Sequence, residues 1–214
     1  MSTLTARRPR VSLVARVLPR MKPAWVTAEA IPNHLLLNVD DYAELGTLAQ
    51  MNPPLRKAAD NAALWAGLGD GIIDFIATDH APHTLEEKNL GYPRAPSGMP
   101  GVETSLPLML THMHAGRCTL ADIQKWMCYG PAHAYAIADK GKILEGWDAD
   151  LTLVDMDVTQ TVQNEKTFTK VKWSPYAGRA LRGWPVYTIV GGEIVFEQGR
   201  IRPGVLGKPL VFTQ

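Results

Sequence analysis

The sequence predicts an α/β fold in which parallel strands and helices are followed by a β-rich part. Two observations predict it. A strand-like segment at residues 25–31 and an apolar strand at 72–78 flank an Ala-rich helical segment at 58–68. This order of strand, helix and strand favours parallel pairing through a crossover connection. Beyond residue 140 the pattern changes to short strands and turns.

The first part of the chain has the pattern of an interior sheet with a helix packed on it. Residues 72–78 form a nearly continuous apolar run, as in a buried strand. Leu64, Trp65 and Leu68 recur at helical spacing in the segment before it. The loop at residues 80–101, rich in Pro and Gly, is too long for a simple connector, and loops of this kind usually carry function.

Two further helices and a hairpin are predicted after this loop. The segment 104–113 is apolar, and Thr119 and Asp122 have the spacing of a capping box. We expect that second helix to end at Gly130–Pro131. In the β-rich part, Gly191–Gly192 separates two strand patterns and favours a two-residue hairpin turn. The expected strands there are 151–154, 186–190 and 194–196.

We divide the chain into a poorly determined basic segment at 1–24, an α/β part at 25–139 and a β-rich part at 140–214. The residues before Glu29 carry six basic side chains and no acid, namely Arg7, Arg8, Arg10, Arg16, Arg20 and Lys22. Such a start is typical of an organelle transit peptide, of a solvated helix, or of a non-native start of a truncated reading frame.

Composition excludes several classes of protein. The 214 residues are 46% hydrophobic and 20% charged, which is enough to bury a core. A net charge of +1 gives no basic footprint for nucleic acid. No apolar run approaches the roughly 20 residues of a membrane span, and no signal-peptide core is present. We therefore expect a cytoplasmic protein with neither nucleic acid nor membrane as a partner.

Asp79 is the main candidate for chemistry. It directly follows the apolar strand, in the segment Ala-Thr-Asp-His-Ala-Pro-His-Thr at 77–84. A carboxylate at the carboxyl end of a parallel strand lies on the face where β/α barrels place their active sites. Asp and His side chains are also zinc ligands. Alternatively, Asp79 caps the following loop, and His80 and His83 only pack against it.

Four motifs in a fixed order extend this observation over about residues 25–205. They are Met-Asn-Pro-Pro-Leu-Arg at 51–56, the segment 74–88, Pro-Ser-Gly-Met-Pro-Gly-Val-Glu-Thr at 96–104, and Lys-Gly-Lys-Ile-Leu-Glu-Gly-Trp-Asp-Ala-Asp-Leu at 140–151. Together they resemble the carboxy-terminal half of class I-like bacterial dihydroorotases, which are metal-dependent amidohydrolases. The resemblance implies part of a (β/α) barrel followed by part of a β-sandwich.

The resemblance also implies roles for individual residues. Asp79 corresponds to the metal ligand on the last barrel strand and to the general acid/base. Asn52 and His83 correspond to the pair that binds the substrate. Ser97 and Gly98 lie where the family offers backbone groups to the substrate ring.

Two positions near the site have more than one interpretation. Glu29 lies where related enzymes have a Glu before Pro-His-His, which makes it a second candidate metal ligand. Asn33 replaces the first His of that stretch, and we do not interpret His34 as a ligand. Without the resemblance, the sequence slightly favours Asn52 as a turn residue before Pro53.

The family's zinc cofactor would lack most of its ligands in this chain. Dihydroorotases of this type also use a His-x-His pair on the first barrel strand, a carboxylated lysine or aspartate, and two more histidines. The only His-x-His here is His112 to His114, in a helical pattern. A catalytic zinc takes about three protein ligands. We therefore expect a truncated or split enzyme with weak or no activity on its own.

The reaction implied by the resemblance is the reversible interconversion of carbamoyl-aspartate and dihydroorotate in pyrimidine biosynthesis, a small-molecule reaction. Allantoinases and hydantoinases are alternative cyclic amidases. A different class of function is a non-catalytic subunit that supports a partner chain. The partner would be a complementary amino-terminal half, a transcarbamoylase, or further copies in a homo-oligomer. The presence of Asp79, Asn52 and His83 favours the split enzyme.

Overall fold

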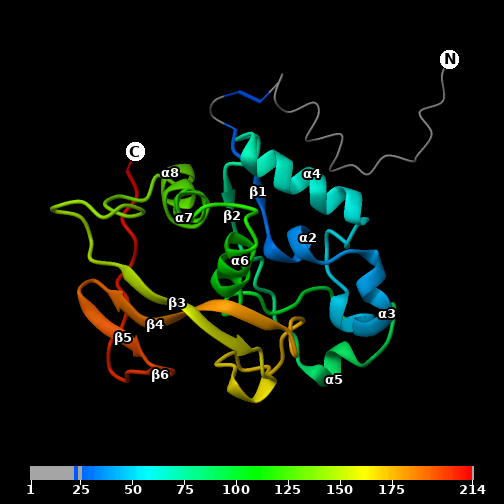
Figure 1. The fold of residues 1–214 in the computed structure, drawn as a ribbon. Helices are drawn as coiled ribbons and strands as arrows, with labels where there is room; N and C mark the ends of the chain where they lie inside the picture. The colour runs from blue at the N-terminus through cyan, green and yellow to red at the C-terminus, as the bar shows by residue number, and fades with distance from the viewer. Residues whose placement is uncertain (1–21, 24–25, 214) are drawn as a thin grey trace. The chain divides into compact units, whose positions relative to one another are not determined.

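The computed structural model describes residues 22–23 and 26–213 (Figure 1). Apart from Lys22 and Pro23, the basic segment at 1–24 lies outside the described residues, and its interpretations stay predictions. The described chain forms two compact units. Unit 1 runs to Glu103 and includes Gln163–Pro175, whereas unit 2 comprises Thr104–Val162 and the residues from Tyr176 onward. The expected boundary near residue 140, based on composition, stays a prediction.

Unit 1 contains a parallel pair of strands together with several helices. Its elements are β1 (Glu29–Ala30), α2 (Pro32–Leu36), α3 (Tyr42–Leu45), α4 (Ala58–Gly69), β2 (Phe75–Ile76) and α5 (Leu85–Lys88), with 3-10 turns η1 (Val39–Asp41), η2 (Gly46–Ala49) and η4 (Asn164–Lys166). Ala30 pairs with Ile76 in parallel register, which confirms the predicted pairing. Both strands are shorter than the predicted segments. Backbone hydrogen bonds extend the pair on either side, from Asp74 to Ala28 and from Ala77 to Ala30.

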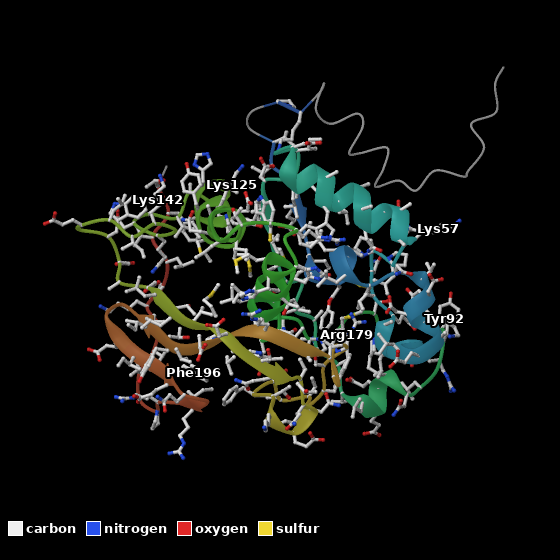
Figure 2. The ribbon with its side chains drawn as sticks, in the orientation of Figure 1. Lys57, Tyr92, Lys125, Lys142, Arg179 and Phe196 are labelled. Carbon is white, nitrogen blue, oxygen red and sulfur yellow. The ribbon has the colours of Figure 1, made fainter. Side chains whose placement is uncertain are left out.

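Helix α4 packs on α2 and fixes it through side-chain hydrogen bonds. It begins after Lys57 (Figure 2), whose N–H donates to the Asp60 carboxylate over 3.0 Å. The Trp65 indole donates to the Leu35 carbonyl at 3.2 Å. The Asn61 amide donates to the carbonyl of Leu37 at 2.8 Å and to a second carbonyl in α2. The predicted helix is confirmed, and Trp65 lies in the core, as expected.

Unit 2 combines helices with an antiparallel sheet. The helices are α6 (Ser105–His114), α7 (Leu120–Gln124), a π-helical turn η3 (Lys125–Tyr129) and α8 (Gly130–Ala134). The sheet has the order β3 (Leu151–Thr161), β4 (Ala180–Val190), β5 (Glu193–Glu197) and β6 (Arg200–Ile201). Helix α6 packs on β4, where a Cβ at Gly183 would lie 2.9 Å from the Cβ of Leu110. Glycine at this position therefore allows the close approach.

Two local predictions for unit 2 are confirmed. Thr119 caps α7, because its hydroxyl accepts the Asp122 N–H at 3.1 Å and the Asp122 carboxylate accepts the Thr119 N–H at 2.9 Å. Val190 pairs with Glu193, so Gly191–Gly192 forms the two-residue turn, with φ angles of +57° and +86°. Positive φ at both turn residues is what this kind of hairpin requires.

The predicted helix end at Gly130–Pro131 is wrong. The helical path continues through the π-helical turn into α8 and ends at Ala134. Pro131 is the second residue of α8 and directly follows the π-helical turn. The wider preceding turn separates this proline from the regular helix before it. Among the described residues, no helix has the length and apolar character needed to cross a bilayer.

Candidate active site

Asp79 lies exposed on a tight turn at the end of β2. Its φ angle of +46° falls in the left-handed region, which Asp tolerates better than most residues. The next residue, His80, accepts the N–H groups of Gly101 and Val102 at its Nδ1 atom, at 3.1 and 3.3 Å. It also pairs with Met99 in a parallel bridge. The turn that carries the carboxylate is therefore tied to the far end of the long loop.

His34, which was not interpreted as a site residue, contacts the motif that contains Asn52. Its Nε2 atom lies 2.8 Å from the Pro53 carbonyl, which only accepts, so Nε2 carries the proton. Burial lowers the pKa of His34, outweighing the hydrogen bond to Pro53 and the charge of Asp79, both of which raise it. The lowered pKa favours a neutral imidazole at neutral pH, hydrogen-bonded to the Asn52 segment.

Two loops carry three of the four predicted substrate-binding residues, Asn52, Ser97 and Gly98. The Asn52 loop is residues 50–56, and the Ser97 loop is residues 95–101. Gly98 donates its N–H to the Gln50 carbonyl at 2.9 Å, and the Gln50 amide donates to the Ala95 carbonyl at 2.5 Å. Asn52 lies exposed two residues beyond Gln50. The structure thus brings the Asn52 and Ser97 loops together.

Lys88, at the end of α5, has a fully buried side chain beneath both loops. Its Nζ atom donates to the carbonyls of Gln50, Pro96 and Gly98, each at 2.9 Å. Its own carbonyl accepts the Thr47 hydroxyl at 2.6 Å. Burial lowers the pKa of Lys88 to about 8. At neutral pH the group remains mainly an ammonium ion, which has three N–H donors for these three acceptors.

His83 lies against the Ser97 loop, and its backbone carbonyl accepts a hydrogen bond from a residue far away in the sequence. Its Nε2 atom donates to the Ser97 carbonyl at 3.2 Å, and its Nδ1 atom lies 3.9 Å from the Glu87 carboxylate. The Trp173 indole donates to the His83 backbone carbonyl at 2.7 Å. Trp173 is buried and belongs to the returning segment Gln163–Pro175.

Glu103 fixes the returning segment in unit 1. Its carboxylate accepts the backbone N–H groups of Phe168 and Thr169, at 2.8 and 2.6 Å. Within the segment, the Asn164 side chain accepts the Ser174 N–H at 2.9 Å. The sequence interpretation missed this support, because neither Trp173 nor Glu103 lies in a periodic pattern that would predict the contact.

The described residues alone do not form a zinc site. Across residues 22–23 and 26–213, no three His, Cys, Asp or Glu side chains are grouped so that they could hold a metal ion. A catalytic zinc takes about three protein ligands. Asp79 and Glu29 could therefore contribute to a metal site only together with other ligands.

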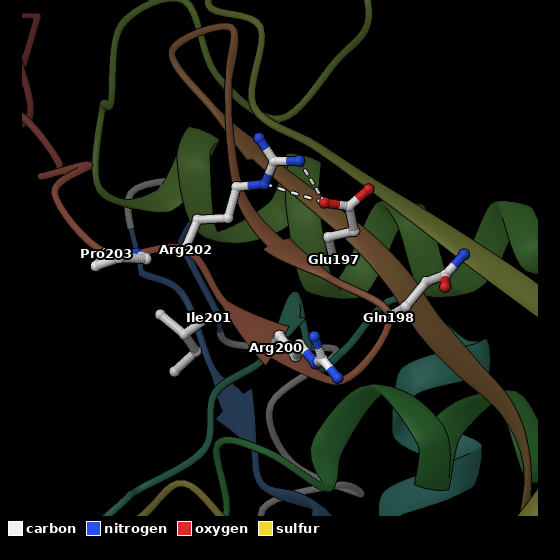
Figure 3. Close-up of a pocket in the computed structure, with 6 residues that line it drawn as sticks. All are labelled: Glu197, Gln198, Arg200, Ile201, Arg202 and Pro203. Carbon is white, nitrogen blue, oxygen red and sulfur yellow. Dashed lines mark hydrogen bonds and ion pairs between the residues drawn. The ribbon is translucent and has the colours of Figure 1, made fainter.

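A separate hollow in unit 2 contains none of the predicted site residues. It follows the hairpin of β5 and β6 and is lined by Glu197, Gln198, Arg200, Ile201, Arg202 and Pro203 (Figure 3). The guanidinium of Arg202 pairs with the Glu197 carboxylate there. This pair offsets one positive and one negative charge of the lining.

The fold and site together define part of an amidohydrolase-type β/α barrel with part of a β-sandwich. The model of the amidohydrolase family matches residues 26–195 of the chain. This match covers well over half of the sequence, and the chain belongs to the amidohydrolase family. The fold class predicted from the sequence is confirmed.

The relatives that this chain resembles include dihydroorotases. The dihydroorotase of Anoxybacillus flavithermus is 46% identical over 176 residues, covering 82% of this chain and 41% of that protein. The dihydroorotase of Bacillus subtilis is 45% identical over 177 residues, with the same coverage. The chain thus spans about two fifths of the length of these relatives. The predicted resemblance to dihydroorotases is confirmed.

Solved structures agree with this assignment. The L-hydantoinase (dihydropyrimidinase) of Arthrobacter aurescens superposes with a TM-score of 0.82 at 34% identity, covering 90% of this chain and 43% of that one. The D-hydantoinase of Thermus sp. gives a TM-score of 0.83 at 23% identity, covering 94% and 44%. The second likeness concerns the fold alone.

Proposed function

We propose that the chain is the substrate-binding and proton-transferring part of a dihydroorotase that interconverts dihydroorotate and carbamoyl-aspartate in pyrimidine biosynthesis. One observation carries the proposal. The Asn52 and Ser97 loops are bonded to each other beside the strand end that bears Asp79, in a chain 46% identical to a dihydroorotase. We further propose that it acts in the cytoplasm.

The proposed chemistry assigns Asp79 the transfer of one proton. Hydrolysis of the cyclic amide breaks its C–N bond, while the oxygen of water bonds to the carbonyl carbon. A proton from that water must reach the departing ring nitrogen, and the Asp79 carboxylate accepts and delivers it. Asn52 and His83 bind polar groups of the substrate, and Ser97 and Gly98 contribute backbone groups. The exposure of Asp79 supports this role.

We also propose zinc as the cofactor of the complete enzyme, with Asp79 as a ligand and Glu29 as a second candidate. Two carboxylates are fewer than the about three protein ligands of a catalytic zinc. The remaining ligands would come from polypeptide outside the described residues, either a complementary segment or another copy of the chain. The proposal involves no nucleic acid and no membrane.

A hydantoinase-type activity is the second candidate, because the L-hydantoinase of Arthrobacter aurescens shares 34% identity with this chain. The two candidates differ in the ring that they hydrolyse. Comparing dihydroorotate with hydantoin under the same conditions discriminates between them. A non-catalytic role predicts turnover of neither ring.

The test uses the full chain, alone and mixed with a polypeptide that supplies the unmatched part of the Bacillus subtilis relative. Zinc content and dihydroorotate hydrolysis are measured for the wild type, Asp79→Asn and the exposed control Asp70→Asn. Asn tolerates the positive φ angle of residue 79, so Asp79→Asn should fold normally. We expect it to lose activity by about 10²-fold or more, and the control to lose none. An active Asp79→Asn variant, or an inactive wild-type mixture, would contradict the proposal.

A further inference from the structure

We propose that Lys88 is a positioning residue that locks the Asn52 and Ser97 loops into one substrate-binding frame through its buried side chain. The inference rests on the proposed function, because it assigns the frame to substrate binding. Lys88 lies beneath the loops rather than among the predicted substrate-binding residues. It would therefore act through the backbone groups that it holds.

The number of acceptors around Nζ equals the number of N–H donors of an ammonium group. Three backbone carbonyls, from Gln50, Pro96 and Gly98, lie 2.9 Å from Nζ. An ammonium group has three N–H donors and no acceptor, so each N–H can meet one carbonyl. Without the ammonium, three carbonyl dipoles would point at one buried position. The lysine therefore determines whether the two loops can adopt this arrangement.

Hydrogen bonds fix both the backbone and the side-chain ammonium of Lys88. Its carbonyl accepts the Thr47 hydroxyl, and α5 begins with a capping box in which the Thr84 hydroxyl accepts the Glu87 N–H at 3.2 Å. All three acceptors of Nζ are backbone groups. The side chain thus has a single set of partners, and all of them belong to the Asn52 and Ser97 loops.

Lys88 binds backbone groups of loops that the proposed function places against the substrate. Both backbone polar groups of Gly98 are hydrogen-bonded. Its N–H donates to the Gln50 carbonyl, and its carbonyl accepts from Lys88 Nζ. Gln50 receives both Lys88 and Gly98 on one carbonyl oxygen. Loss of the ammonium should therefore free the Ser97 loop and the start of the Asn52 loop together.

The first arm of the test is amide hydrogen exchange on the full chain carrying Lys88→Met, which keeps the length of the side chain and removes the donors. We expect exchange in residues 48–55 and 95–101 to accelerate about tenfold or more, with much less change in α4. Lys172→Met is the matched control, because Lys172 donates to the single carbonyl of Thr167 in the same unit. Uniform acceleration across unit 1 would show a general packing role and overturn the proposal.

The second arm restores the charge. Lys88→Cys is alkylated with 2-bromoethylamine in the unfolded state, which rebuilds a lysine with sulfur in place of one methylene, and then refolded. Cys118 and Cys128 react as well, so the identically treated wild type is the reference. We expect slow loop exchange to return with this group and not with an uncharged group of similar length. Equal recovery with both would overturn the role of the ammonium.

The third arm connects Lys88 to substrate binding. In the assembled enzyme, Lys88→Met should raise KM for dihydroorotate about tenfold or more while changing kcat less, since Asp79 is not among its contacts. A matching loss in kcat alone would contradict a positioning role in binding. If the wild type neither binds nor hydrolyses dihydroorotate, the proposed function fails, whereas the exchange arms still decide whether Lys88 braces the loops.

Discussion

Replacing Gly98 by alanine should destabilise unit 1 and disturb the Ser97 loop. Gly98 has a φ angle of +132°, and a Cβ there would lie 2.6 Å from the Ala81 carbonyl oxygen and 2.8 Å from the Ala81 Cβ. Neither atom can rotate away, because both are fixed by the backbone. Strained backbone costs about 1–3 kcal/mol, and overpacking a further 1–3 kcal/mol or so. The free energy of unfolding should therefore fall by about 2–6 kcal/mol.

Urea unfolding measures this loss, through the midpoint and slope of the transition. Gly91→Ala is the control, because Gly91 also has a positive φ, +73°, but a Cβ there would meet no atom within 4 Å. It should lose only the cost of the left-handed backbone, about 1–2 kcal/mol. If Gly98→Ala costs no more than Gly91→Ala, the close contact with Ala81 does not constrain the loop, and the reasoning is refuted.

Three further predictions concern other parts of the chain. Trp173→Phe should lower the free energy of unfolding by about 1–2 kcal/mol, because the His83 carbonyl loses its donor while most of the ring packing remains. An unchanged urea unfolding midpoint would contradict this prediction. Burial lowers the pKa of Lys88 from 10.5 to about 8, so between these values the unfolded chain binds more protons than the folded one. The free energy of unfolding should then rise with pH over that window, by at most about 3 kcal/mol. If a Lys88→Met variant shows the same rise, Lys88 is not its source. Gly141→Ala should lower the free energy of unfolding by about 1–3 kcal/mol more than Gly146→Ala does. The φ angles of the two glycines are similar, +90° and +85°, but only a Cβ at residue 141 would meet α8 and η3, at 2.9 Å. Equal unfolding midpoints of the two variants would refute this reasoning.

Features set by neighbouring residues could be predicted from the sequence. The capping box at Thr119 needs only the spacing to Asp122, and the hairpin turn needs only Gly191–Gly192 between two strand patterns. The parallel pair followed from the order of strand, helix and strand along the chain. The predicted site residues Asn52, Ser97, Gly98 and His83 came from the family resemblance, and the structure connects their loops through hydrogen bonds.

The supports of the site could not be predicted in this way. Trp173 meets His83 across 90 positions, and no local pattern selects that pair. A lysine after two glutamates has the composition of an exposed helix turn, yet Lys88 is fully buried because three carbonyls converge on it. The predicted helix end at Gly130–Pro131 was wrong because the helical path continues past the proline by way of a π-helical turn, which the local sequence does not signal.

The return of Gln163–Pro175 to unit 1 has a consequence for the order of synthesis. A ribosome makes the residues up to Glu103 first, and must add unit 2's helices and strand β3 before Trp173 exists. Until then, the His83 carbonyl and the Glu103 carboxylate lack the donors that fix them in the finished chain. The nascent chain should therefore carry a His83 segment without these hydrogen bonds for several seconds, at elongation rates of roughly 5–20 residues per second. The final arrangement of the His83 segment therefore forms only after the chain has been made as far as Trp173.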